Sequence, residues 1–195
     1  MTLPKNRNWL LATAGLLGLC ALLALWPAGT AQLEWSRDLI VHGQVWRLWT
    51  AHLTHFHFNQ WFWDGAMFAL LIYLARPFVP GIDLCRLCLV SAPVIAISVF
   101  SQDSISIYRG LSGIDMALAV FVWARSKSQF LNSRTWLIVG GLIGAKLAAE
   151  CAGYSVFVQG ESVYQPLALA HLSGSLTGLV MGFWPWFKLH RPGIF

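Results

Sequence analysis

Ser112 and His171 are the two residues of this sequence whose types could do covalent chemistry together. Ser112 lies in GLSG at 110–113, and His171 lies in AHLSG at 170–174. A hydroxyl beside an imidazole base is the arrangement that activates serine for attack on a carbonyl carbon. Both stretches lie in apolar segments, where ionisable groups cost free energy and usually face a cavity or a reaction centre. The pair predicts a Ser-His site inside an apolar bundle.

The composition indicates an integral membrane protein. Of the 195 residues, 57% are hydrophobic and only 11% are charged, whereas a soluble domain carries about 25% charged residues. We expect a single domain over residues 1–195, because no linker or low-complexity run divides the sequence. The net charge of +5 comes from dispersed basic residues at the ends of apolar segments. Membrane lipids are therefore expected partners, and nucleic acid is not.

Apolar runs predict an all-α membrane protein with six transmembrane helices. A helix needs about 20 residues to cross about 30 Å of hydrocarbon. The expected spans are 9–27, 48–75, 84–101, 110–124, 135–152 and 166–187. The fourth span covers only about 22 Å at about 1.5 Å per residue, so its outer end should be submerged in a hydrated hollow. Ser112 would lie in its first turn, where free N–H groups favour an oxyanion.

Basic residues in the short loops predict the orientation in the membrane. Cytoplasmic loops carry an excess of Lys and Arg, so the side with more of them is the cytoplasm. That side would hold both termini, and the tryptophan-containing segment 28–47 would rest in the outer interface. The expected cytoplasmic residues are Lys5, Arg7, Arg76, Arg86, Arg125, Lys127, Arg134, Lys188 and Arg191, against Arg37, Arg47 and Arg109 outside.

Polar side chains from four of the expected spans fall at similar depths in the outer half of the membrane. Counted at about 1.5 Å per residue, the depths are about 18 Å for Ser112, Asp64 and Lys146 and about 24 Å for Gln60, His171 and Glu150. Lys146 and Glu150 are four residues apart, so a structural ion pair is favoured over a direct contact with substrate. Asp115 lies one turn below Ser112 and receives no catalytic role without geometry.

Small residues predict close contact between the fourth and sixth spans. Gly174 and Gly178 share a helix face with His171, and Gly113 lies on a matching small face of the fourth span. Such faces let helix backbones approach closely in lipid. The contact would bring the His171 imidazole within hydrogen-bond reach of Ser112. A packing interface with an incidental serine and histidine is the alternative.

These motifs resemble the rhomboid intramembrane serine proteases. The sequences YRGLSG at 108–113 and AHLSGSLTG at 170–178 match the GxSG and AHxxGxxxG signatures on helices four and six of that family. The resemblance extends over nearly the whole chain. It implies a six-helix rhomboid-like bundle with a short central fourth helix, and a Ser112-His171 dyad that works without a metal or cofactor.

The sequence VWRLWTAHLTH at 45–55, with Trp63, Asp64 and the Lys146/Glu150 pair, resembles the rhombosortase branch of bacterial rhomboids. This resemblance implies an inner-membrane enzyme that processes secreted or surface proteins. Its substrate would be a transmembrane C-terminal sorting tag with a Gly-Gly motif, an apolar span and a basic tail. Release by an amine instead of water would make it a transpeptidase-like enzyme.

The second span departs from the general rhomboid pattern. Where rhomboids carry two histidines and an asparagine, this sequence has His55, Gln60 and Asp64. The later two positions usually help to bind the oxyanion. Gln60 can donate a hydrogen bond, but an ionised Asp64 cannot, so Asp64 is either protonated or orients another group. His55 is expected at the cavity mouth and Gly110 beside the oxyanion site.

Two other classes stay open. A catalytically inactive rhomboid-like protein would bind membrane helices without cutting them, and the departures at Gln60 and Asp64 keep this class open. A haem- or metal-binding membrane subunit would use the histidine cluster of His52, His55 and His57 with Asp64 and Glu150, and haem would be held between His55 and His171. The sequence contains no HExxH motif, which makes a zinc site the weaker hypothesis.

Overall fold

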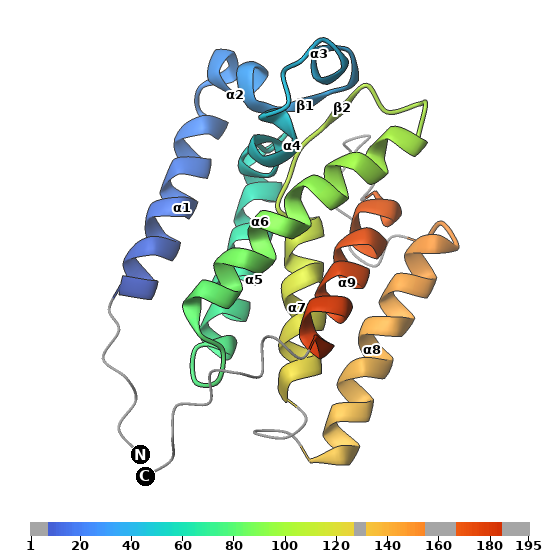
Figure 1. Cartoon of the computed structure of the whole chain (residues 1–195). Coiled ribbons are helices and arrows are strands. Elements are labelled where there is room, and N and C mark those ends of the chain that lie inside the picture. Colours follow the sequence, from blue (N-terminus) through green and yellow to red (C-terminus); the bar gives the residue numbers. More distant parts are fainter. Residues whose placement is uncertain (1–7, 127–131, 155–166, 185–195) are drawn as a thin grey trace.

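The computed structural model describes residues 8–126, 132–154 and 167–184. This part of the chain is mostly helical, and six long helices lie alongside one another within it (Figure 1). They are α1 (Asn8–Ala24), α5 (Phe58–Ala75), α6 (Gly81–Ser98), α7 (Ser112–Ser126), α8 (Ser133–Cys151) and α9 (Ala168–Phe183). A helix is therefore present in each of the six segments where the apolar runs predicted one.

Short elements gather at one end of the bundle, at the top of Figure 1. Residues 27–57 make up most of them, and we call this segment the cap. It contains α2 (Pro27–Leu33), β1 (Trp35–Ser36), α3 (Arg37–Val41), α4 (Arg47–Thr50) and the 3-10 helix η1 (Ala51–Leu53). The 3-10 helix η2 (Val99–Ser101) follows α6, and β1 pairs antiparallel with β2 (Ile107–Tyr108).

The expected start of the second span, at residue 48, is wrong. Helix α5 begins at Phe58, because the chain first forms α4 and η1 and then becomes extended at Thr54 and His57. The Thr54 hydroxyl donates to the Ala51 carbonyl at 2.8 Å. Side-chain bonds of this kind compete with helix continuation, so the apolar run 48–75 contains α4, η1 and α5 instead of one helix.

One helix of the described chain is long and apolar enough to cross a membrane by itself, namely 81–101. A second span results if the bent pair 11–24 and 27–33, which meet at 112°, is counted as one. Helix α9 is apolar but has 16 residues, and α7 has 15. The helical bundle is thus observed, whereas six membrane crossings remain a prediction.

Helix α7 is central and α8 is peripheral. Helix α7 contacts α5, α6, α8 and α9, and buried side chains such as Leu118 and Phe121 line it on several sides. Of the residues 133–151 that form α8, Glu150 alone is buried. The chain after β2 descends along the bundle before α7 begins, so Ser112 starts its helix below the cap (Figure 1).

Proline in α6 provides the attachment point of the cap. Pro93 has no N–H to donate to the Leu89 carbonyl one turn earlier, and Trp49 Nε1 donates to that carbonyl instead, at 3.0 Å. Trp35 Nε1 donates to the Ala96 carbonyl at 3.0 Å. Two indole groups of the cap therefore bind the backbone of α6.

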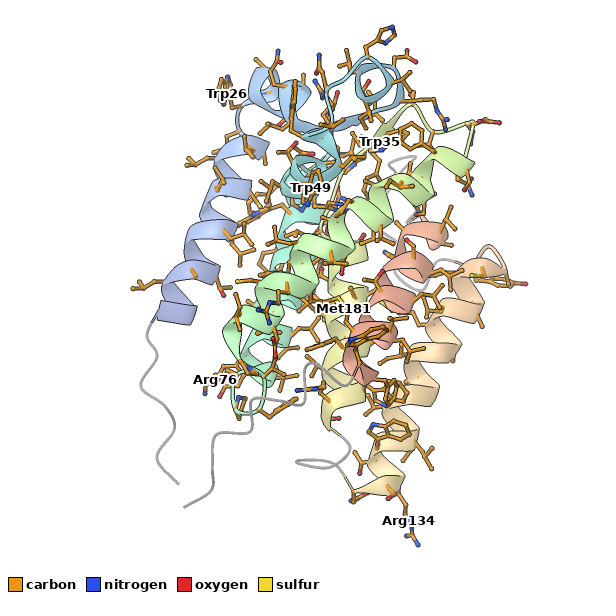
Figure 2. The ribbon with its side chains drawn as sticks, viewed as in Figure 1. Trp26, Trp35, Trp49, Arg76, Arg134 and Met181 are labelled. Carbon is orange, nitrogen blue, oxygen red and sulfur yellow. The ribbon has the colours of Figure 1, made fainter. Side chains whose placement is uncertain are left out.

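Tryptophans and arginines lie at both ends of the bundle. Figure 2 shows Trp26, Trp35 and Trp49 at the cap end, and Arg76 and Arg134 at the opposite end. Trp136 lies two residues after Arg134 in α8 and stacks on Trp123, so tryptophans are present at the arginine end as well, and the orientation in the membrane remains a prediction. The predicted cytoplasmic residues Lys5, Arg7, Lys127, Lys188 and Arg191 lie outside the described residues.

Candidate active site

Ser112 is the first residue of α7 and follows a turn whose backbone conformation favours glycine. Gly110 has φ of +123°, a backbone conformation that favours glycine. A Cβ at this position would also lie 2.4 Å from Gln60 Nε2 and 3.2 Å from Asp64 Oδ2. The turn is thus fitted against α5, and the half-buried Ser112 side chain emerges where the N–H groups of α7 lack helical partners. We call residues 109–111 the nucleophile turn.

The carbonyl groups of the nucleophile turn bind side chains of α5 and the cap. Gln60 Nε2 donates to the Arg109 carbonyl at 3.2 Å. His52 Nδ1 lies 3.2 Å from the Gly110 carbonyl, and its Nε2 lies 3.0 Å from the Ala92 carbonyl of α6. The buried His52 ring therefore links the turn to α6, which gives it a structural position.

Asp64 holds the amide side of the same turn. Its Oδ2 accepts the Leu111 N–H at 3.1 Å and lies 3.5 Å from His55 Nε2. Of the two roles that the sequence left open for Asp64, this contact matches the orientation of another group. The four candidates Gln60, Asp64, His55 and Gly110 thus meet at the turn before Ser112, although the structure does not test an oxyanion role for any of them.

An ion pair clamps the turn to the cap. Arg109 Nε donates to Glu34 Oε2 at 2.7 Å, and its Nη2 contacts the same oxygen. Arg47, which is buried, donates to the Glu34 carbonyl at 2.6 Å and to the Ala31 carbonyl at 3.0 Å. Charge-assisted bonds of this type are roughly twice as strong as neutral ones, so the cap and the chain that leads to Ser112 are joined.

His171 is buried in the first turn of α9. Its Nδ1 lies 2.8 Å from Glu150 Oε2, and the other oxygen of that carboxylate, Oε1, accepts from Lys146 Nζ at 2.7 Å. His171 Nε2 is buried and makes no hydrogen bond within the described part of the chain. The nitrogen that a general base would use is therefore available.

Glycines bring the helices of the two candidates into backbone contact. A Cβ at Gly174 would lie 2.1 Å from the Gly113 carbonyl oxygen, and one at Gly178 would lie 2.2 Å from another α7 carbonyl oxygen. Ser112 directly precedes Gly113, and His171 lies one turn before Gly174. No hydrogen bond joins the two candidates among the described residues. Catalytic hydrogen bonds are often long before substrate binds and tighten afterwards.

The contact between Glu150 and His171 was missed from the sequence. The equal depth of the two residues was the available signal, but the i,i+4 spacing of Lys146 and Glu150 accounted for the charges locally. Asp115 is buried, and its Oδ1 has no hydrogen-bond partner among the described residues. Neither ring nitrogen of His171 bonds to Asp115.

The other histidines of the predicted cluster do not form a metal site in the described chain. Within residues 8–126, 132–154 and 167–184, no group of three or more His, Cys, Asp or Glu side chains is arranged to hold a metal ion. His52 contacts two backbone carbonyls instead.

Comparison with known proteins gives a distant homology to a rhomboid. The chain is 29% identical over 161 residues to the rhomboid protease GlpG of Yersinia enterocolitica, and the aligned part covers 78% of this chain and 52% of GlpG. The chain thus spans about half the length of that relative. No protein-family model matches the chain. The homology supports the rhomboid family and an integral membrane protein, and it does not separate the rhombosortase branch from other rhomboids.

Proposed function

We propose that this chain is an intramembrane serine endopeptidase of the rhomboid type, with Ser112 as nucleophile and His171 as general base. The backbone contact between Gly113 and Gly174 carries the proposal. It joins the helix turn that presents Ser112 to the helix turn that presents a buried imidazole with an unbonded Nε2. The distant homology to a rhomboid protease supports the same activity.

In the proposed reaction the Ser112 hydroxyl attacks the carbonyl carbon of the scissile peptide bond. His171 Nε2 accepts the hydroxyl proton and then delivers it to the leaving amine. The oxyanion is bound by N–H groups at the start of α7, the Ser112 N–H above all, with the Gln60 amide as a second donor. Because Gln60 also donates to the Arg109 carbonyl, the backbone groups carry the larger share.

The first test is covalent labelling by a fluorophosphonate probe. Wild-type protein in detergent micelles should be labelled on Ser112, as shown by mass spectrometry of the modified peptide. Ser112→Ala and His171→Ala should lose the label. Ser173→Ala is the matched control, because within the described chain Ser173 Oγ bonds to Ser98 Oγ and to the Ala170 carbonyl, and its loss should leave labelling intact. Equal labelling of the Ser112→Ala protein refutes the assignment.

We further propose that the substrate is a transmembrane C-terminal sorting tag with a Gly-Gly motif, an apolar span and a basic tail. The support is the rhombosortase resemblance of 45–55 and of Trp63 with Asp64. Purified enzyme and a tagged substrate in lipid vesicles would test it, with the same substrate lacking the Gly-Gly motif as control. The mass of the new C-terminus separates the acceptors, because water leaves a free carboxylate and an amine leaves an amide.

The proposed setting is a bacterial inner membrane, crossed six times by a single domain of 1–195 with both termini in the cytoplasm. The separation of Trp26 and Trp35 from Arg76 and Arg134 supports this orientation (Figure 2). Thiol labelling from each side of sealed vesicles would test it. In a cysteine-free background, a cysteine replacing Gly43 should react from outside and one replacing Arg134 from the cytoplasmic side.

The missing hydrogen bond between Ser112 and His171 favours a second candidate, a catalytically inactive rhomboid-like protein that binds membrane helices. The probe experiment separates the two candidates. A folded wild-type protein that binds a tag-bearing helix but never takes up the label would support the inactive protein.

A further inference from the structure

Lys146, Glu150 and His171 form a continuous chain of side-chain contacts between α8 and α9. Glu150 Oε1 accepts a hydrogen bond from Lys146 Nζ at 2.7 Å, and Glu150 Oε2 lies 2.8 Å from His171 Nδ1. The side chains of Glu150 and His171 are about equally buried, with 5% and 6% exposed, whereas that of Lys146 is 24% exposed. The ammonium group thus lies at the more open end and the imidazole at the closed end.

An ion pair within α8 does not by itself explain why Glu150 is buried. Lys146 and Glu150, four residues apart, could neutralise each other on an exposed helix surface. Instead Glu150 is the buried residue of α8, the helix whose other residues in 133–151 are at least partly exposed. Burial of a carboxylate is costly unless both of its oxygens are bonded. The second oxygen finds its partner on α9, in the imidazole of His171.

The partner decides which tautomer His171 adopts. A carboxylate only accepts hydrogen bonds, and a neutral imidazole has one donor and one acceptor nitrogen. Glu150 therefore selects the form with the proton on Nδ1, which leaves the lone pair on the unbonded Nε2. When Nε2 takes up the Ser112 proton, the ring becomes a cation whose Nδ1–H still points at a negative oxygen.

We propose that Glu150 is a positioning residue for His171, and that Lys146 fixes the orientation of Glu150. The inference rests on the proposed function of His171 as the base. Glu150 holds the tautomer and angle of the ring and stabilises the imidazolium, while it remains ionised throughout. Lys146 matters because an ammonium group only donates hydrogen bonds. The atom of residue 150 that faces Lys146 must therefore be an oxygen.

This asymmetry gives an unusual expectation for Glu150→Gln. Lys146 holds the amide oxygen, so the amide NH₂ faces His171 and donates to Nδ1. The ring proton then moves to Nε2, which cannot accept from Ser112. In the double variant Lys146→Met, Glu150→Gln the amide is released and can turn its oxygen towards His171, which restores the Nδ1–H tautomer. The second substitution should therefore repair the first.

If Glu150 served only to hold α8 against α9, a role we call a structural clasp, the double variant would label more slowly than the single one. Glu150→Gln keeps the shape and both hydrogen bonds, so a clasp would survive it with little change. Loss of Lys146 as well would then weaken the clasp further. The relative labelling of the single and double variants distinguishes the two roles.

The experiment measures the rate of fluorophosphonate labelling of Ser112 in the full-length protein. Replacing the carboxylate of a catalytic triad by its amide costs about 10⁴-fold, and we expect Glu150→Gln to lose at least about 100-fold. The double variant should recover at least about tenfold. Asp83→Asn is the matched control, because it converts another buried carboxylate that is paired with a neighbouring base, Arg86, on α6. The control should label at the wild-type rate.

Nitrogen NMR of histidine-labelled protein gives a second readout that does not need activity. His171, assigned by the loss of its signals in His171→Gln, should carry its proton on Nδ1 in the wild type and on Nε2 in Glu150→Gln. A wild-type proton on Nε2, or a double variant that labels no faster than the single one, overturns the proposal. If wild-type protein is not labelled at all, the proposed function fails, and the tautomer measurement still decides whether Glu150 orients His171.

Discussion

Ser112 and His171 are held in two different ways. The turn before Ser112 is fixed through its backbone, since Gln60 binds the Arg109 carbonyl and Asp64 binds the Leu111 N–H. His171 is fixed through its side chain, by a carboxylate on a helix that is otherwise largely exposed. The comparison teaches that the proposed nucleophile is held by the backbone of its turn, whereas the proposed base depends on one neighbouring side chain.

Helix α8 is attached to the bundle near each of its ends. Near its start, Trp136 stacks on Trp123 of α7 with ring centres 4.4 Å apart, and each indole N–H donates to the backbone carbonyl of the other residue. Near its end, Glu150 bonds to His171. If the comparison holds, damage at the nucleophile turn should be severe and damage at the tryptophan pair should be mild.

The largest effect is expected from Gly110→Ala. The added Cβ would meet Gln60 Nε2 at 2.4 Å at a positive φ, so the Gln60 amide must leave the Arg109 carbonyl and the backbone of the nucleophile turn is strained. We expect a loss of about 2–4 kcal/mol in stability and at least a 100-fold slower probe reaction (about 2.7 kcal/mol in the barrier). Thermal unfolding in micelles measures the loss of stability, and the labelling rate of Ser112 measures the slower probe reaction. Gly43→Ala is the control, because it has a positive φ but open space around it, and it should cost only about 1 kcal/mol.

The next effect is expected from Gly174→Ala, which forces α7 and α9 apart. Its Cβ would lie 2.1 Å from the Gly113 carbonyl oxygen, a backbone atom that cannot move away alone. Overpacking of this kind costs about 1–3 kcal/mol, seen as a lower melting temperature. Gly141→Ala on α8 meets nothing within 4 Å and should leave the melting temperature nearly unchanged. Equal melting of the two variants would contradict the close contact.

Asp64 offers a graded test of the nucleophile turn. Asp64→Ala leaves the buried Leu111 N–H without its acceptor, which costs about 1–3 kcal/mol. Asp64→Asn keeps an acceptor oxygen and should lose less than half as much. Melting temperatures of the two variants measure this order. A reversed order would show that the charge of Asp64, not its acceptor role, is what the turn requires.

The smallest effect is expected from Trp136→Phe at the far end of α8. The ring is retained and one hydrogen bond to Trp123 is lost, so stability should fall by about 0.5–1.5 kcal/mol while the labelling rate of Ser112 stays within about twofold (about 0.4 kcal/mol). A tenfold slower rate would sink the comparison, since it would mean that the base depends on the whole of α8.

The helices and the paired glycine faces could be predicted from the sequence because they are local patterns. Apolar runs marked the helices, and the spacing of Gly174 and Gly178 marked the contact face. The cap could not be predicted, since Arg47 and Glu34 organise it through contacts between distant residues. The partner of His171 could not be predicted for the same reason. The residues around Glu150 show no periodic pattern of apolar positions that would indicate which face of α8 packs against α9.

The proline of α6 has a consequence for the membrane depth of the proposed reaction. Because Pro93 leaves the Leu89 carbonyl to Trp49, the cap is anchored on the helix that, in the described chain, is long enough to cross the lipid unaided. Helix α7 is too short to register against both membrane surfaces. If Ser112 is the nucleophile, α6 therefore sets the depth at which a peptide bond would meet it. A thinner or thicker bilayer would then shift the substrate relative to the serine, not the serine relative to its scaffold.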